Sequence, residues 1–87
     1  MNATAIRRLD TTKPKKVRYV LRVAAGEQYV GDILLTVNNR VWRHADTIPT
    51  DVVLKALLAF DRRGETYGRV IGREDQQTYT WFVLNGN

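Results

Sequence analysis

The chain has 87 residues, of which 44% are hydrophobic and 26% are charged, and its net charge is +5 at pH 7. A chain of this length forms one domain at most, with a modest hydrophobic core. It contains no cysteine, which excludes disulfides and thiolate chemistry, and no apolar run approaches the roughly 18 residues of a membrane helix. We therefore expect a cytoplasmic protein that does not insert into membranes.

Residues 1–14 mix small, polar and basic side chains and end at Pro14, and we expect them to form a flexible basic N-terminal arm. Residues 1–16 hold five basic side chains and one acidic side chain, whereas residues 17–87 hold nine basic and eight acidic ones. The excess charge is therefore concentrated at the N-terminus. A basic arm on a near-neutral body is typical of nucleic-acid-binding proteins, and a solubilising terminus has the same composition.

Three strands are predicted after the arm. Residues 16–24 alternate between apolar and polar side chains, which is the period of a half-buried strand. A loop of residues 26–28 with its turn glycine, Gly26, leads to a second β-rich run at 30–37. Asn38 and Asn39 predict a two-residue hairpin turn, because asparagine tolerates positive φ, and residues 40–44 form the third strand.

This register separates the side chains of the three strands into two faces, as expected where one face is buried. It pairs Leu21 with Ile33, Leu35 with Trp42 and Leu34 with Arg43. The apolar face comprises Val17, Tyr19, Leu21, Val23, Ile33, Leu35, Val37 and Trp42. The solvent face comprises Lys16, Arg18, Val20, Arg22, Asp32, Leu34, Thr36, Val41 and Arg43.

A helix is predicted at about 51–63. Thr50 suits the N-cap, Asp51 suits the positive end of the helix, and Gly64 suits the residue just after it. Its apolar surface is unusually wide, which predicts a helix covered on two sides or one that meets a second copy of the chain in a homodimer. The residues of this surface are Val53, Ala56, Leu54, Leu57, Leu58, Ala59 and Phe60.

Residues 66–73 and 78–84 read as a second hairpin. A two-residue turn at Asp75 and Gln76 would place Gly72 opposite Tyr79. The same register pairs Gly68 with Val83, Val70 with Trp81 and Arg69 with Phe82. Aromatic rings that lie over strand glycines compensate for the missing side chains.

The order is three strands, one helix and two strands, and no parallel crossover is required. We therefore predict an α+β fold in which antiparallel sheet, as one sheet or two, packs on a single helix. The predicted organisation is an arm at 1–14 and a single domain at 15–87.

Catalysis has little support in the sequence. His44 is the one histidine, and an acid–base pair with Asp46 is less common than a histidine with purely structural hydrogen bonds. No spacing indicates a metal site or a phosphate loop, so we expect no cofactor and no enzymatic activity. A compact ribonuclease-like enzyme that uses His44 with arginines stays the weakest alternative.

The basic face is the strongest functional signal. Guanidinium groups bind phosphates bidentately, and such contacts supply most of the affinity for nucleic acid. We therefore expect a small nucleic-acid-binding accessory or regulatory protein, for DNA or RNA. The expected contact residues are Arg7, Arg8, Lys13, Lys15, Lys16, Arg18, Arg22 and Arg43.

Two further points are left open by the sequence. If Tyr67 and Phe82 flank Arg69 on an uncovered face, they would form a surface for base stacking, and if the helix covers them they would not. The main alternative function is a protein-interaction module, such as a small inhibitor or adaptor of phage or mobile-element type, that covers an acidic partner surface. The wide apolar helix and the exposable edges of the hairpins motivate it.

Overall fold

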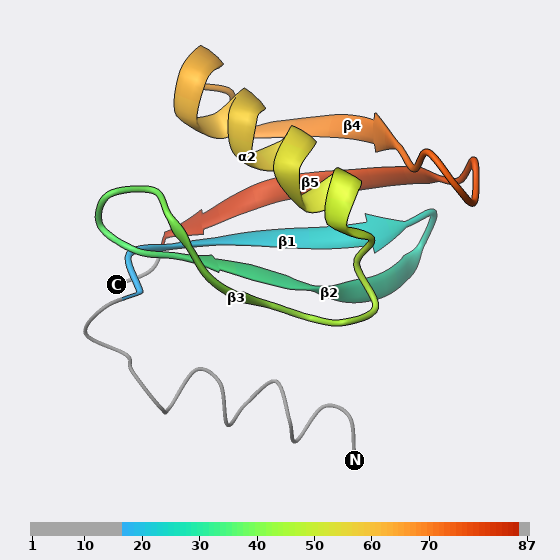
Figure 1. Cartoon of the computed structure of the whole chain (residues 1–87), viewed down its shortest axis with the longest axis horizontal. Helices are drawn as coiled ribbons and strands as arrows, with labels where there is room; N and C mark the ends of the chain where they lie inside the picture. The colour runs from blue at the N-terminus through green and yellow to red at the C-terminus, as the bar shows by residue number, and fades with distance from the viewer. Residues whose placement is uncertain (1–16, 86–87) are drawn as a thin grey trace.

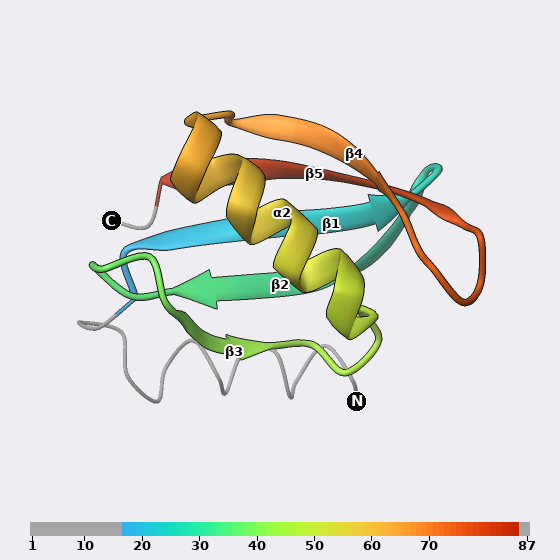
Figure 2. The same ribbon diagram turned by 45° about the horizontal axis from the view of Figure 1, so that its top comes forward.

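One face of a five-stranded antiparallel sheet is covered by a helix that crosses the strands diagonally (Figures 1 and 2). The computed structural model describes residues 17–85, so the expected arm at 1–14 and the domain boundary after it lie outside the described residues. The strand order in the sheet is β3-β2-β1-β5-β4. The elements are β1 (Tyr19–Ala25), β2 (Gln28–Leu35), β3 (Val41–His44), α2 (Thr50–Arg63), β4 (Tyr67–Ile71) and β5 (Thr78–Asn85). The predicted α+β class is confirmed, with one sheet rather than two.

The predicted pairing of β1 with β2 is confirmed, although the turn between them is different. Tyr19 lies opposite Leu35, and Leu21 lies opposite Ile33. The turn has two residues, starting at Gly26 with φ 64°, and a bulge between Val23 and Ala24 in the pairing restores the register. The extra residue on β2 is Val30, which takes the place of the third loop residue that we expected.

The connection between β2 and β3 shows the opposite compensation. The loop is longer than predicted, since the amide of Thr36 donates to the carbonyl of Arg40 and Asn39 has φ 61°. A bulge at Trp42 then brings Leu34 opposite Arg43, as predicted. Leu35 pairs with Val41 instead of Trp42. A three-residue loop that ends in the left-handed region is a common hairpin connection, and asparagine is one of the few residues that adopt this conformation easily.

The bulge and the loop change the expected environment of three side chains. Val41 packs against the core instead of lying on the solvent face. Val37 belongs to the loop and is 63% exposed, so its predicted place on the apolar face is wrong. Trp42 is half-buried, and its indole nitrogen is enclosed without a hydrogen-bond partner in the described part of the chain.

Helix α2 ends as the sequence predicts but begins differently. Gly64 has φ 67° and its amide donates to the carbonyl of Phe60, while the amide of Glu65 donates to Ala59. The bond from Gly64, which is in the left-handed region, to Phe60 is the αL type of helix C-terminus, and the bond from Glu65 satisfies a further carbonyl of the last turn. At the start, Thr50 is the first helical residue and Pro49 occupies the cap position without a side-chain hydrogen bond, so the predicted Thr50 cap is wrong. No helix within residues 17–85 is long and apolar enough to span a membrane.

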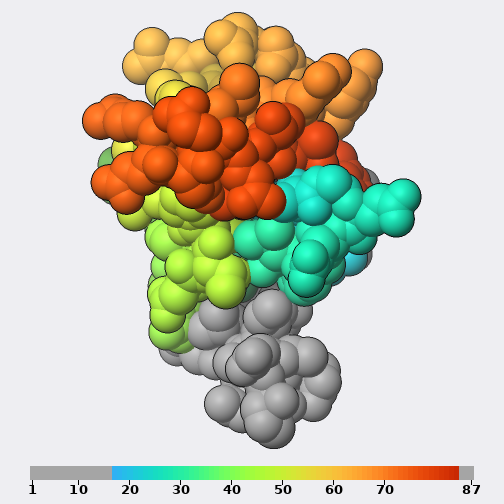
Figure 3. Space-filling model, turned by 90° about the vertical axis from the view of Figure 1, so that its right-hand side faces the viewer, coloured from blue at the N-terminus to red at the C-terminus, as the bar shows by residue number. Residues whose placement is uncertain are grey.

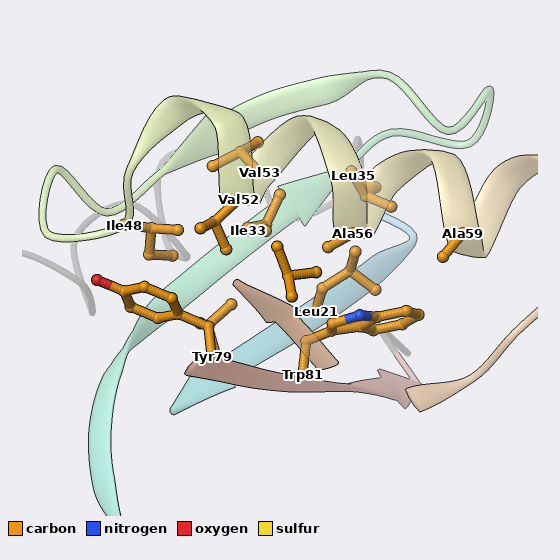
Figure 4. Close-up of a cluster of buried hydrophobic side chains, with 12 residues drawn as sticks. Leu21, Ile33, Leu35, Ile48, Val52, Val53, Ala56, Ala59, Tyr79 and Trp81 are labelled. Atoms are coloured by element: carbon orange, nitrogen blue, oxygen red, sulfur yellow. The ribbon is translucent and has the colours of Figure 1, made fainter. Parts of the chain in front are cut away.

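The side of α2 that faces the sheet consists of Val52, Val53, Ala56 and Ala59. These residues meet Leu21, Ile33, Leu35 and Trp81 from three neighbouring strands, and Figure 4 shows the two layers in contact. Leu54 and Leu58 lie on the outer side and are 53% and 51% exposed. The helix is therefore covered on one side only, and the expectation that a second layer covers it is not met within the described residues.

The second hairpin pairs two residues away from the predicted register. Gly68 lies opposite Trp81, Val70 opposite Tyr79, and Arg69 opposite Thr80. The loop contains four residues, closed by a bond from the amide of Gly72 to the carbonyl of Gln77. A shift of two residues keeps every side chain on its face. The expected cover of glycine by an aromatic ring is present, since a methyl group on Gly68 would lie 2.9 Å from Nε1 of Trp81.

Candidate nucleic-acid interface

The sheet face turned away from α2 carries a row of aligned side chains across four strands. Arg22 of β1 lies opposite Asp32 of β2 and, on its other side, opposite Phe82 of β5. Phe82 in turn lies opposite Tyr67 of β4. In an antiparallel sheet, directly opposed residues share a face. The row therefore runs Asp32, Arg22, Phe82 and Tyr67 across the face that the helix leaves open.

Within this row, Arg22 is engaged by an acidic neighbour. Its Nε donates to Oδ1 of Asp32 at 3.0 Å and its Nη2 donates to Oδ2 at 3.1 Å. The guanidinium carbon also lies 5.3 Å from the ring centroid of Tyr29. The side chain of Arg22 is 43% exposed, whereas that of Asp32 is only 5% exposed. The two charges offset each other, and Arg22 is the partner of a buried carboxylate, while its role as an anion ligand stays a prediction.

The two aromatic members of the row are accessible. Tyr67 is 74% exposed and Phe82 is 44% exposed. The amide of Val83 donates to the carbonyl of Thr66, so Thr66 and Val83 form a hydrogen-bonded pair. The adjacent pair, Tyr67 and Phe82, is then the non-hydrogen-bonded kind, in which the Cα atoms are about 4.5 Å apart and the side chains approach most closely. Tyr67 and Phe82 thus lie side by side on neighbouring strands, and both are accessible to solvent.

Arg69 lies beside this pair. It follows Tyr67 by two residues on β4, so it lies on the same face, and it is exposed. It is opposite Thr80 and diagonal to Phe82, a distance of about 7 Å that long side chains span. Among the described residues, no ion pair or hydrogen bond engages its guanidinium group. We call Tyr67, Arg69 and Phe82 the aromatic–arginine patch.

The structure places the predicted contact residues as follows. Arg18 is exposed, and its guanidinium carbon lies 6.0 Å from the ring centroid of Tyr19. Arg43 is exposed on β3, the edge strand opposite to β4. Arg18 and Arg22 are four residues apart on one chain segment, which corresponds to about 13 Å. The described arginines are spread over the face and do not form one cluster. The remaining predicted residues, Arg7, Arg8, Lys13, Lys15 and Lys16, lie outside the described residues.

Side chains on this face of the sheet differ in how far they are exposed to solvent. Leu34 shares the face with Arg22, as the register predicts, but it is only 1% exposed and belongs to no solvent surface. On β4 and β5, by contrast, Thr78, Thr80 and Ile71 are exposed together with the patch. The β4–β5 half of this face is therefore accessible, whereas the β1–β3 half is buried at Asp32 and Leu34 and exposed at Arg18 and Arg43.

His44 has a structural environment. It lies opposite Ile33, and its Nδ1 is 2.9 Å from the carbonyl oxygen of Ala45. Because a carbonyl only accepts, Nδ1 carries the proton in this contact. The described hydrogen bonds do not link His44 to Asp46. Within residues 17–85, no group of three or more His, Cys, Asp or Glu side chains is arranged to hold a metal ion.

One end of the sheet carries a tightly bonded loop. The tips of the β1–β2 and β4–β5 hairpins lie at this end (Figures 1 and 3). The hydroxyl of Tyr79 donates to Oδ2 of Asp75 at 2.6 Å, and the amide of Gln77 donates to Oδ1. These bonds lower the pKa of Asp75, and the carboxylate raises the pKa of Tyr79 to about 12. The amide of Arg73 donates to Asp51, which ties the loop to the start of α2.

Comparison of the chain with protein-family models, with curated proteins and with solved structures gave no match. The geometry of the chain's own residues is thus the basis for assigning its function.

Proposed function

We propose that the protein binds single-stranded nucleic acid on the open face of its sheet, with bases stacked on the aromatic–arginine patch. The observation that carries the proposal is the exposed cross-strand pair of Tyr67 and Phe82 beside Arg69, on the face opposite to the helix. Exposed neighbouring aromatic rings on a sheet are costly to leave in water, and base stacking is one interaction that makes use of them.

The patch supplies two kinds of contact. The rings of Tyr67 and Phe82 offer flat apolar surfaces, and every base has a matching face, so such stacking tolerates many sequences. Arg69 can pair with a phosphate in two parallel hydrogen bonds, or stack on a base itself. Since the bases in a duplex are already stacked on one another, this surface favours single strands over duplexes.

More distant basic residues add electrostatic attraction that does not depend on sequence. Arg18 and Arg43 are exposed, and residues 1–16 carry a net charge of +4 in sequence. Each phosphate neutralised by such a group releases counterions, so the affinity falls steeply as salt increases. In this proposal the patch gives the preference for single strands, and the scattered charges give a large share of the affinity.

Fluorescence anisotropy with a labelled single strand of about 12 nucleotides tests the proposal, because known single-strand sites span about 4–16 nucleotides. Tyr67→Ala and Phe82→Ala should each weaken binding by about 5- to 150-fold, which corresponds to about 1–3 kcal/mol per stacked base. Leu54→Ala, an exposed residue on the opposite side of the molecule, is the matched control and should leave the affinity unchanged.

The arginines are tested separately from the rings. Arg18→Ala, Arg43→Ala and Arg69→Ala combined should weaken binding and reduce its salt dependence. Arg22 is left intact, because its replacement would remove the ion-pair partner of the buried carboxylate of Asp32. Failure of the wild-type chain to bind single strands at low salt would remove the proposal. Binding that depends on the arginines but not on either ring would retain nucleic-acid binding and remove the stacking surface.

A further inference from the structure

A groove runs between the C-terminal half of α2 and strand β4, on the side of the sheet opposite to the aromatic–arginine patch. Its volume is about 410 Å³, and it is lined by Leu58 and Ala59 of the helix together with Gly68, Val70 and Trp81 of the sheet. Leu58 is 51% exposed, so the groove has an accessible apolar wall. The groove lies beside β4, which is an edge strand of the sheet.

The free edge of β4 presents a regular set of backbone groups. Thr66 with Val83, and Gly72 with Gln77, are joined by backbone hydrogen bonds to the β5 side. Hydrogen-bonded and non-hydrogen-bonded pairs alternate along an antiparallel ladder, so Gly68 and Val70 also point their amide and carbonyl groups to β5. The amide and carbonyl groups of Tyr67, Arg69 and Ile71 then point away from the sheet. This is the pattern that a further strand would pair with.

The indole ring of Trp81 lies directly over Gly68 at the floor of the groove. A methyl group on Gly68 would lie 2.9 Å from Nε1 of Trp81 and 3.2 Å from Cε2, so any side chain at this position would displace the ring. The indole N–H of Trp81 makes no hydrogen bond to the described residues. Trp81 is a donor-only side chain, so an acceptor group in the groove would satisfy it.

The charges around the groove select its occupant. Lys55, Arg63 and Arg69 line it together with a single acidic residue, Glu65. Glu65 is engaged by Arg63, whose Nε lies 3.3 Å from Oε2, which leaves the positive charges of Lys55 and Arg69 in excess. A second copy of the chain fits poorly, because antiparallel pairing of two β4 strands about their centre would place Arg69 opposite Arg69. The chain's own residues 1–16 carry a net charge of +4 and are repelled as well.

We propose that this groove binds an extended acidic segment of another protein, which adds to the sheet as a sixth strand beside β4. Side chains of such a strand alternate between the two faces. Apolar side chains would enter the groove against Leu58 and Trp81, and acidic side chains would lie on the other face beside Arg69. This site is separate from the proposed nucleic-acid interface and does not depend on it, although Arg69 contributes to both.

A synthetic peptide of about seven residues, in which valine alternates with glutamate, is the probe for this site, since strands of this length are typical. The labelled peptide should bind the full chain, measured by fluorescence anisotropy. Leu58→Glu should weaken binding about tenfold or more, because it places a carboxylate against the apolar side chains that enter the groove. Leu54→Glu is the matched control, since Leu54 is equally exposed on α2 but does not line the groove, and its effect should be below about twofold.

A second pair of variants tests the pairing of backbones. Ile71→Pro removes an outward-pointing amide without removing a bond to β5, which proline tolerates at an edge, whereas Ile71→Thr keeps the amide. The proline variant should lose peptide binding, and the threonine variant should retain it.

Three outcomes would overturn the proposal: equal binding of a peptide with lysine in place of glutamate, equal effects of Leu58→Glu and Leu54→Glu, or a homodimer of the wild-type chain that Ile71→Pro abolishes. The last would show that the occupant is a second copy. Single-strand binding by the Leu58→Glu variant, which leaves the patch intact, separates failure of this proposal from failure of the proposed function.

Discussion

At the scale of single residues, Arg22 shows how one contact fixes the position of a side chain. Its alternation with Leu21 and Val23 correctly places it on the open face, where the sequence predicts a phosphate ligand. Asp32, however, is opposite and 5% exposed, and a buried carboxylate requires a partner. Arg22 supplies both hydrogen bonds. The requirement of the buried carboxylate therefore determines where the guanidinium group lies.

Replacement of Arg22 should consequently lower stability more than replacement of an exposed arginine. We expect Arg22→Ala to lower the free energy of unfolding by about 1–3 kcal/mol, the usual cost of an unsatisfied polar group, towards the lower end because water reaches the site. Arg18→Ala should change it by less than about 0.5 kcal/mol. Urea denaturation measures both, and adding Asp32→Asn to Arg22→Ala should restore part of the loss. Equal stability of the two single variants would show that the pair contributes nothing.

At the scale of elements, strand identity and facing follow from alternation, while loop lengths do not. The pairings of Leu21 with Ile33 and Leu34 with Arg43 were predictable because burial of one face penalises slips by one residue. The bulges at Val30 and Trp42 were not predictable from alternation. Each bulge is compensated by a change of one residue in the length of the neighbouring loop, so the alternation in the paired segments is the same with or without it. In the β4–β5 hairpin, a shift of two residues preserves both faces, so alternation alone does not distinguish the registers.

The β4–β5 loop makes the stability of this hairpin depend on pH. The hydrogen bond between Tyr79 and Asp75 raises the pKa of Tyr79 to about 12 from 10.0 and lowers the pKa of Asp75 from 3.8. A group whose pKa is raised by folding stabilises the fold at pH values below its pKa in the unfolded chain, and this contribution is lost as pH rises through its pKa in the folded protein. A group whose pKa is lowered by folding stabilises the fold at pH values above its pKa in the unfolded chain, and this contribution is lost as pH falls through its pKa in the folded protein.

Tyr79→Phe is the variant that tests this bond. We expect wild type to exceed Tyr79→Phe in free energy of unfolding by a constant amount between about pH 5 and pH 9, since both groups are then in their favoured forms. The difference should shrink above about pH 10, as Tyr79 ionises, and below about pH 4, as Asp75 is protonated. Denaturant titrations over this range measure it. A difference that stays constant from pH 3 to pH 11 would contradict a role for the bond.

At the scale of the whole molecule, the position of the single described helix divides the surface. Because α2 covers one face of the sheet, the apolar side chains of that face form the core, and the exposed rings of Tyr67 and Phe82 remain on the other. The sequence allowed either outcome for these rings, since it did not place the second hairpin relative to the helix. The sequence predicted the accessibility of Arg18 and Arg43 but not the burial of Leu34 on the same face.

The most direct test of the account is a nuclear magnetic resonance titration of the full chain with an unlabelled single strand of about 12 nucleotides. We expect the resonances of the ring protons of Tyr67 and Phe82 and of the Nε–H of Arg69 to shift on addition of the strand, while those of the methyl groups of Leu54 and Leu58 on the helix do not. Shifts confined to the helix side, or none at the two rings at saturation, would contradict it.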